Sequence, residues 1–285
     1  MTKSPPRKVR VYGAAKVNIG WRVGERRPDG YHDVRGMLHT ISLTDRLDIE
    51  TGVGDVPVRV VVPGHPGLQD DANIVHAAAA LLAEKAEPRP TTIVVHKSIP
   101  VAAGLGGGSA DAAAALVGLN AAWNARRSAK ELVELAAEVG SDVPGIMLGG
   151  LVHVTGRGER VRNRGGGTDG WFVLGVSSIG VSAADAYEAF DRLSTEDAPA
   201  TLHHNDLQAA ACALVDGLEG RLDAMRRAAG VAFVAGSGPT VVGVTSDEAH
   251  ARDVVARVRD TFADVIVAQP ITWGVRLAVG GEGGA

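Results

Sequence analysis

The 285-residue sequence contains a single cysteine, Cys212. One cysteine excludes an internal disulfide framework and a metal site built from clustered cysteines. Cys212 lies in the run QAAACALV, which predicts a small apolar core residue on a helix. The sequence also lacks a strong charge excess, because 29 basic and 33 acidic residues give a formal net charge of −4. Nothing in this balance favours nucleic acid or an anionic membrane, so a phosphate-bearing ligand would need locally arranged backbone amides and a few cations.

Long apolar runs are absent as well. The alanine- and leucine-rich stretch at residues 77–83 is far shorter than the roughly 20 residues that a transmembrane helix needs. The first ten residues, MTKSPPRKVR, lack the apolar core of a secretory signal, so we expect a cytoplasmic protein. With 45% hydrophobic and 22% charged residues, the chain has an ordinary globular composition and is long enough for one large domain or two smaller ones.

Strand-like and helix-like segments follow one another in groups. Runs rich in β-formers predict strands at residues 9–23, 37–42, 47–50, 58–62, 91–97, 148–155, 171–177, 231–234 and 240–244, with a last strand pair near the end. Helices are predicted at residues 73–85, 109–123, 128–140, 183–193, 206–228 and 248–260, two of them opened by capping-box spacings at 128–131 and 245–248. Because strands occur in runs, the pattern favours an α+β fold over a doubly wound parallel sheet. The stretch RGGGTDG at 164–170 predicts a turn or a hairpin near a domain seam.

The most unusual segment is PVAAGLGGGSADAAAAL at residues 100–116, a glycine cluster directly before a strong helix. Glycines at the start of a helix let backbone N–H groups approach an anion, and the helix dipole favours negative charge there. The loop is not a Walker A sequence, since no Gly-Lys-Ser/Thr follows, and it fits the dinucleotide GxGxxG pattern poorly. A tight strand-to-helix connection without a ligand is the alternative interpretation.

The loop resembles the phosphate-binding motif of the GHMP kinases, the superfamily of galactokinase, homoserine kinase and mevalonate kinase. The matching residues are Pro100, Gly104, Leu105, Gly106, Gly107, Gly108, Ser109 and Ala110. Two further stretches are similar to motifs of the same superfamily, in the same order along the chain. They are AKVNI at residues 15–19 and GSGPT at residues 236–240.

Within the superfamily, the chain is most similar to the cytidine-diphosphate-methylerythritol kinases of the non-mevalonate isoprenoid pathway. RPDGYH at residues 27–32 and GSDVP at residues 140–144 carry this resemblance, supported by KSIP at 97–100, GRGE at 156–159 and NDL at 205–207. The resemblance implies a two-lobed α+β fold, with a ribosomal-protein-S5-like ATP-binding domain at residues 1–155 and an α/β substrate-binding domain at residues 156–285. The active site would lie in the cleft between the lobes. The implied reaction moves the γ-phosphoryl group of ATP, with Mg²⁺, to the 2-hydroxyl of a cytidyl diphosphate sugar alcohol.

The resemblance also implies the catalytic pair. Asp142 would accept or orient the hydroxyl proton, and Lys16 would stabilise the negative charge that develops during transfer. Asn18 is two residues from Lys16, so on a strand it projects to the same face and can share the site. Without the motifs, Lys16 is a solvated strand residue, Asp142 makes a turn and Asn18 is an ordinary polar strand residue.

Binding residues follow from the resemblance in the same way. For ATP they are Asn73 and Lys97 near the adenine, together with Pro100 and the loop from Gly104 to Ser109; for the substrate they are Asn18, Tyr31, His32, Gly236, Ser237 and Gly238. Tyr31 would stack on the cytosine and His32 would hydrogen-bond to its edge. Asn73 is also an excellent helix N-cap, and residues 236–240 could form only a tight strand connection. No dedicated metal cage is evident in the sequence, so Mg²⁺ would be held by phosphate oxygens and water.

Three departures from the family pattern affect the substrate side. Gly145 stands where an aromatic residue is common, residues 177–184 match loosely, and the region between 191 and 205 is short. Another GHMP small-molecule kinase is one alternative, although RPDGYH argues against it because those substrates carry no base. A nucleotide-binding protein without catalysis is the other, and the presence of both Lys16 and Asp142 argues against it. We expect small molecules as partners, no nucleic acid or membrane, and a monomer or weak homodimer.

Overall fold

The computed structural model describes residues 6–52, 56–69, 72–165, 167, 169–193 and 202–278. The predicted turn at 164–170 and the short region between 191 and 205 lie partly outside these residues. In the described part of the chain, no helix combines the length and the apolar character needed to cross a membrane.

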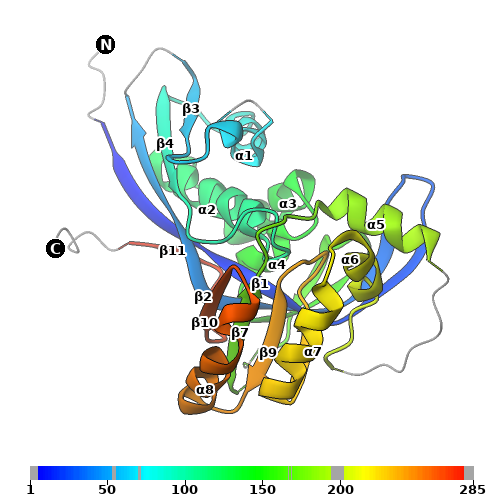
Figure 1. Ribbon diagram of the computed structural model, residues 1–285. Coiled ribbons are helices and arrows are strands. Elements are labelled where there is room, and N and C mark those ends of the chain that lie inside the picture. Colours follow the sequence, from blue (N-terminus) through cyan, green and yellow to red (C-terminus); the bar gives the residue numbers. More distant parts are fainter. Residues whose placement is uncertain are drawn as a thin grey trace, which may run out of the picture.

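A seven-stranded sheet forms the first half of the molecule (Figure 1). Its main path runs β11 (Val275–Leu277), β1 (Lys8–Arg26), β2 (His32–Thr51), β4 (Thr91–His96) and β3 (Val58–Val61), while β5 (Leu151–Thr155) pairs with β2 and β6 (Arg160–Asn163) pairs with β5. Among the strands that the structure describes, β3 and β4 are the only pair that runs in parallel. The long β1–β2 hairpin contains register shifts, one of them between Ala14 and Lys16, which change the direction of the side chains that follow.

Helices α1 (Ile74–Ala83), α2 (Gly107–Ala122) and α4 (Val143–Leu148) pack on this sheet, and α3 (Ala129–Val139) packs against these three helices. A short 3₁₀ helix lies at Pro66–Leu68. Helix α2 is central, and its alanine block is buried because α2 lies directly against β1 and β2. At Gly13 of β1 an added Cβ would lie 2.3 Å from the Ala110 carbonyl oxygen. Small residues on both elements therefore allow the close approach that holds the start of α2 against β1.

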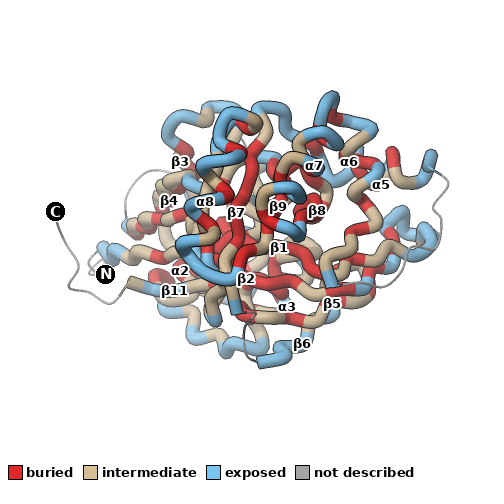
Figure 2. Tube along the Cα trace, turned by 60° about the horizontal axis from the view of Figure 1, so that its bottom comes forward, coloured by how far each residue is buried: buried red, intermediate tan, exposed pale blue. Residues whose placement is uncertain are grey.

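A four-stranded antiparallel sheet forms the second half, in the order β10 (Asp264–Ala268), β7 (Trp171–Val176), β9 (Val241–Thr245) and β8 (Val231–Val234). Helices α6 (Gln208–Leu214), α7 (Leu218–Ala229) and α8 (Glu248–Val258), with a 3₁₀ turn at Arg259–Thr261, cover it around a second hydrophobic cluster. Cys212 of α6 is partly buried against this cluster. Helix α5 (Ala183–Arg192) instead lies beside the far ends of β1 and β2 (Figure 1). Figure 2 shows the buried residues concentrated in the strands of both sheets.

The structure confirms the α+β class and most predicted elements, but three expectations were wrong, and helix α4 and strand β6 were not predicted. Residues 37–42 and 47–50 belong to one continuous strand, β2. The last two strands do not pair with each other, because β10 joins the second sheet and β11 the first. Helix α4 was not predicted, since Val-Pro-Gly signals a turn. Thr245 does not cap α8: it ends β9, and the Asp247 side chain accepts the His250 amide instead.

The two sheets divide the chain at a different point from the predicted domain boundary at residue 155. Strand β6 continues the first sheet through Asn163, and the chain returns to that sheet at β11 after completing the second one. The first strand of the second sheet begins at Trp171.

Candidate functional site

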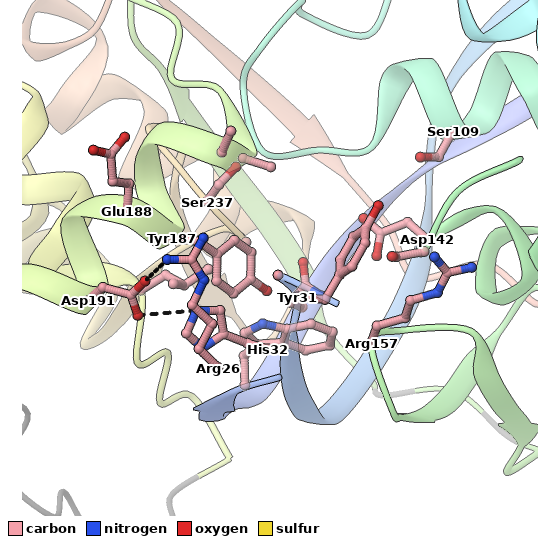
Figure 3. A pocket seen from close by; sticks show the side chains of 18 of the residues that line it. Arg26, Tyr31, His32, Ser109, Asp142, Arg157, Tyr187, Glu188, Asp191 and Ser237 are labelled. Atoms are coloured by element: carbon pink, nitrogen blue, oxygen red, sulfur yellow. Dashed lines mark ion pairs between the residues drawn. The ribbon is translucent and has the colours of Figure 1, made fainter. Parts of the chain in front are cut away.

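A cavity of about 700 Å³ is lined by residues from both halves of the chain. The side chains come from β1, the β1–β2 turn, the start of α2, the α3–α4 junction, the β5–β6 turn, α5 and the β8–β9 loop. They include Lys16, Asn18, Trp21, Arg26, Tyr31, His32, Ser109, Ser141, Asp142, Arg157, Tyr187, Glu188, Asp191, Leu207, Gly236 and Ser237. In Figure 3, Ser109, Asp142, Arg157 and Tyr31 lie on one side, and Tyr187, Glu188 and Asp191 of α5 lie on the other.

Lys16 is a buried cation at the centre of the first side. Its ammonium Nζ lies 3.0 Å from Asp142 Oδ2, 2.5 Å from Asn18 Oδ1 and 3.0 Å from the Gly104 carbonyl oxygen. These three acceptors match the three N–H donors of a lysine, which fixes the direction of the side chain. The Lys16 backbone amide also donates to the Leu105 carbonyl oxygen over 2.9 Å. The glycine loop and β1 are therefore joined at the residue that carries the charge.

Asp142 stands at the N-terminal end of α4, where a carboxylate would ordinarily cap the helix. Its side chain makes no capping hydrogen bond. The carboxylate is instead directed to Lys16 and retains 26% exposure toward the cavity. Its second oxygen is thus available to a ligand, and the interpretation of Asp142 as a simple turn residue does not describe this geometry.

The glycine loop owes its shape to two residues with positive φ. At Gly104 (φ 78°) an added Cβ would lie 2.2 Å from the Ala235 carbonyl oxygen, so the loop touches the strand-loop-strand segment of the second sheet. At Gly106 (φ 71°) an added Cβ would lie 2.9 Å from Lys16 Cε. Helix α2 begins directly afterwards, and no side chain caps its first turn. The free amides and the positive end of the helix dipole form a cradle suited to an anion.

Lys97 lies beneath this loop and does not line the cavity. Its Nζ is held by Asp45 Oδ2 at 2.5 Å and by Asp111 Oδ2 at 2.6 Å. Burial opposes the charge of Lys97, but the two carboxylates outweigh burial and raise its pKa. Burial raises the pKa of Asp111 to about 8, against the attraction of Lys97. Asp45 also accepts the Ser98 and Ile99 amides, so this cluster anchors the chain that enters the loop.

The opposite end of the cavity is aromatic. The His32 ring stacks on Tyr187 with centroids 5.3 Å apart and meets Phe190 edge-on. Its Nδ1 contacts the Gly24 carbonyl oxygen at 2.9 Å, and its Nε2 lies 3.1 Å from Asp191 Oδ1 (Figure 3). A base could therefore hydrogen-bond to His32 only in place of Asp191. Burial raises the pKa of the Tyr187 hydroxyl to about 12, with a further increase from the nearby Asp142 charge and an opposing effect of Trp21.

The segment HHNDL at residues 203–207 connects the two halves around the cavity. Asn205 Nδ2 donates to the carbonyl oxygens of Val234 and Gly236, at 2.7 and 2.8 Å. Asp206 Oδ2 accepts the Val23 amide of β1 at 2.8 Å, and its Oδ1 pairs with Arg22. Residues 205 and 206 thus fix the loop containing Gly236 and Ser237 against β1.

The structure brings eight of the predicted residues together at one cavity. Lys16, Asn18, Tyr31, His32, Ser109, Asp142, Gly236 and Ser237 line the cavity. Gly104, Gly106 and Gly238 shape the adjoining backbone, while Leu105 is buried and supplies the carbonyl that receives the Lys16 amide. Pro100, Gly107 and Gly108 belong to the loop but do not line the cavity, and Asn73 caps α1 by accepting the Val75 amide at 2.9 Å. The predicted ATP contacts of Asn73 and Lys97 stay predictions.

Several lining residues were not predicted from the sequence, chiefly Trp21, Arg157, Tyr187, Glu188 and Asp191. Three of these, Tyr187, Glu188 and Asp191, lie on α5, just after the loosely matching segment at 177–184, and no motif was quoted for this region. Arg157 was within a quoted motif, GRGE, without an assigned role. Among the described residues, no group of three His, Cys, Asp or Glu side chains is arranged to hold a metal ion.

Comparisons with known proteins agree on one family. Residues 73–150 match the GHMP kinases N terminal domain and residues 185–264 match the GHMP kinases C terminal domain. Curated 4-diphosphocytidyl-2-C-methyl-D-erythritol kinases from Bacillus velezensis and Thermobifida fusca are 36% and 38% identical, covering 89% and 92% of this chain and 93% and 96% of their own.

Solved structures have the same two-domain fold. A crystal structure of 4-(cytidine 5'-diphospho)-2C-methyl-D-erythritol kinase aligns with a TM-score of 0.71 at 29% identity, over 93% of this chain and 98% of that one. A homoserine kinase from Cytophaga hutchinsonii aligns with a TM-score of 0.75 at 16% identity, over 98% of this chain and 99% of that one, which supports the fold alone. With the sequence identity, the domain matches and the shared fold in agreement, the chain belongs to the 4-diphosphocytidyl-2-C-methyl-D-erythritol kinases of the GHMP kinase superfamily.

Proposed function

We propose that this chain transfers the γ-phosphoryl group of ATP to the 2-hydroxyl of 4-diphosphocytidyl-2-C-methyl-D-erythritol, a step of the non-mevalonate isoprenoid pathway. The observation that carries the proposal is the Lys16–Asp142 ion pair, 3.0 Å between Nζ and Oδ2, which opens into the cavity beside the uncapped start of α2. Relatives that share 36% to 38% of their residues with the chain bear this activity in their names.

The ion pair suits an alcohol acceptor. The free oxygen of Asp142 can accept the hydrogen bond of a hydroxyl group and aim the hydroxyl oxygen at the phosphorus atom. The Lys16 ammonium, fixed by Asn18 and the Gly104 carbonyl, stabilises negative charge on the transferring group. Phosphoryl transfer depends mainly on alignment and charge stabilisation, and both are supplied by side chains that other contacts already hold in place.

The glycine loop suits the phosphates of ATP. Gly106 leaves no room for a Cβ, which would lie 2.9 Å from Lys16 Cε, and a Cβ at Gly107 would lie 3.1 Å from Ile99 Cγ2, close enough to require a small shift of Ile99. The backbone amides of this turn can therefore approach phosphate oxygens without side chains in between, and Ser109 faces the cavity. Mg²⁺ fits this arrangement as an ion held by phosphate oxygens and water, where it would neutralise phosphate charge.

The aromatic end suits a nucleobase. Tyr31 is half exposed at the tip of the β1–β2 hairpin, and Tyr187 lies across the cavity on α5. Flat aromatic faces provide stacking surfaces for a base. We also propose that residues 1–155 chiefly bind ATP and residues 156–285 chiefly bind the substrate. Tyr31 and His32 lie in the first of these ranges but would contact the substrate. A cytoplasmic location and a monomeric or weakly dimeric state stay predictions.

The activity is tested by measuring ADP release with Mg-ATP and a panel of acceptors: the cytidyl substrate, mevalonate, homoserine and galactose. We expect turnover with the cytidyl substrate and only background release with the other three. Turnover with another acceptor, and none with the cytidyl substrate, would replace the proposal with that kinase activity.

A further inference from the structure

A buried cluster of charged side chains lies beneath the glycine loop and does not line the cavity. It consists of Asp45 of β2, Lys97 after β4 and Asp111 of α2, and each side chain is at most 8% exposed. Lys97 Nζ lies 2.5 Å from Asp45 Oδ2 and 2.6 Å from Asp111 Oδ2. A Cβ added at Gly107 would lie 3.2 Å from the same Nζ. The cluster therefore packs directly against the backbone that begins α2.

The charge of this cluster depends on whether both of its carboxyl groups are ionised. Asp45 has the contacts of a carboxylate, because its Oδ1 accepts the Ser98 and Ile99 amides at 2.6 and 2.9 Å and its Oδ2 accepts from Lys97. Among the residues that the structure describes, Asp111 accepts a hydrogen bond from Lys97 alone, and its Oδ1 is buried without a partner. A buried charged oxygen without a donor is costly, whereas a protonated carboxyl is neutral and can itself donate. The contacts thus indicate an ionised Asp45 and a protonated Asp111.

The electrostatic surroundings of Asp111 agree with this assignment. Burial and the Asp45 carboxylate raise the pKa of Asp111 to about 8, against the opposing effect of Lys97. The other elements packed against α2, which are α1, α3, α4, β1 and β11, place no described ionisable group against Asp111. Lys16 of β1 contacts the loop at Gly106 and pairs with Asp142 instead. Asp111 is therefore the member of the cluster whose charge changes near pH 8.

The position of the cluster connects this charge to the anion cradle. Asp111 stands two residues after Ser109, in the helix whose uncapped first turn forms the cradle. With Asp111 protonated the cluster is neutral, and with Asp111 ionised it carries one net negative charge. Repulsion between this charge and bound phosphates would be strong, because water and salt screen buried charges poorly.

We infer that Asp111 is a positioning residue of the cradle: it holds a proton that keeps the cluster neutral, and nucleotide phosphates bind more weakly once this proton is lost. The inference rests on the proposed function, because it takes the glycine loop as the phosphate site. It goes beyond that function in coupling the binding of the nucleotide to the uptake of a proton at a side chain that the nucleotide does not touch.

The test measures the binding of Mg-ADP by calorimetry between about pH 7.5 and about pH 9.5, around the titration of Asp111. In wild type the Kd should rise with pH, by at most about tenfold per pH unit, because one proton is bound together with the nucleotide. Asp111→Asn keeps the shape of the protonated side chain and does not titrate. Its Kd should stay constant over this range and be lower than that of wild type at the upper end.

The matched control is Asp253→Asn. Asp253 is an exposed aspartate of α8 that pairs with Arg257 and does not line the cavity. Its variant should follow the wild-type profile, with the same rise of Kd at high pH. This control separates the removal of one carboxylate from the removal of the carboxylate beneath the loop.

A second readout counts the proton directly. Calorimetry in two buffers of different ionisation enthalpy gives the number of protons that the protein takes up when ADP binds. Wild type should take up a fraction of a proton that approaches one at the upper end of the range, and Asp111→Asn should take up none. Since the measurement on wild type stands by itself, it decides the question even where Asp111→Asn does not fold. A merely structural role of Asp111 would change the Kd equally at every pH.

The outcomes separate this inference from the proposed function. Parallel Kd profiles or equal proton uptake in wild type and Asp111→Asn would overturn the inference, as would ADP binding by wild type without proton uptake. Phosphorylation of the cytidyl substrate by wild type would leave the proposed function standing in all of these cases. Absence of that phosphorylation, with proton-coupled ADP binding intact, would refute the proposed function and leave the inference valid for a nucleotide-binding protein. Absence of any ADP binding would refute both.

Discussion

Gly106 offers a sharp test of how the glycine loop and the catalytic lysine depend on each other. In Gly106→Ala, the new Cβ would lie 2.9 Å from both Cγ and Cε of Lys16 and 3.3 Å from Ile146 Cδ1. The backbone at this position has φ 71°, which costs a residue with a side chain about 1 to 2 kcal/mol. The substitution therefore has two effects, one on stability and one on the position of Lys16.

The second effect can be estimated from the contacts. Relief of the overlap requires the Lys16 side chain to move by about half an ångström, since ordinary carbon contacts begin near 3.4 Å. That movement lengthens the contacts of Nζ with Asp142 and Asn18, now 3.0 and 2.5 Å. Displacements of about 1 Å at a reacting centre can cost about 100-fold in rate, so we expect kcat to fall by about 10- to 100-fold.

The matched control is Gly64→Ala, because Gly64 has φ 80° but no atom within 4 Å of an added Cβ. Both variants should lose about 1 kcal/mol or more of unfolding free energy in urea denaturation. Only Gly106→Ala should lose turnover in an ADP-release assay. Wild-type kcat in Gly106→Ala would refute the argument that this glycine makes room for Lys16.

Three further variants test other parts of the site. Asp142→Asn keeps the shape of the side chain and removes its charge, so kcat should fall by about 10²- to 10⁴-fold with ATP affinity preserved; wild-type turnover would remove Asp142 from the mechanism. Asn205→Ala leaves the Val234 and Gly236 carbonyls without their donor, so urea denaturation should show a loss of about 1 to 3 kcal/mol, and unchanged stability would mean that other donors replace it. The pKa of Asp111, about 8 in the fold against an ordinary 3.8, means that wild-type stability falls as pH rises between these values. Asp111→Asn should therefore show a flatter dependence of Tm on pH than wild type, whereas parallel profiles would show that Asp111 does not titrate in this range.

Local sequence patterns predicted the elements that carry the site. The two-residue spacing of Lys16 and Asn18 indicated one strand face, and the structure joins their side chains at 2.5 Å. Glycines before an alanine block indicated a helix start suited to an anion, and α2 begins at Gly107 without a side-chain cap. Ser128 and Glu131 form the predicted capping box. Each of these features depends on residues only a few positions apart, so local sequence determines it.

Features that depend on distant residues were not predictable in this way. The Lys97 side chain donates to Asp45, which is 52 residues away in the sequence. The Asn205 side chain donates to the Gly236 carbonyl oxygen, at a separation of 31 residues. Tyr187 enters the cavity because α5 packs against the β1–β2 hairpin, which no pattern within residues 183–193 specifies. The predicted N-cap of α8 was Thr245, but Asp247 holds that position in the structure. Thr245 pairs with Trp171 of β7 and thereby extends β9. In each case, contacts with residues distant in the sequence select one of the conformations that the local sequence allows.

In the proposed reaction, the γ-phosphoryl group of ATP is transferred in this cavity to an alcohol of the cytidyl substrate. Phosphorus-31 NMR of wild type with Mg-ATP and 4-diphosphocytidyl-2-C-methyl-D-erythritol tests it directly. We expect a new phosphomonoester signal that grows in step with ADP, while the diphosphate signals of the substrate persist and no inorganic phosphate accumulates. Release of inorganic phosphate without a monoester signal, or no reaction with this substrate, would refute the proposed kinase reaction.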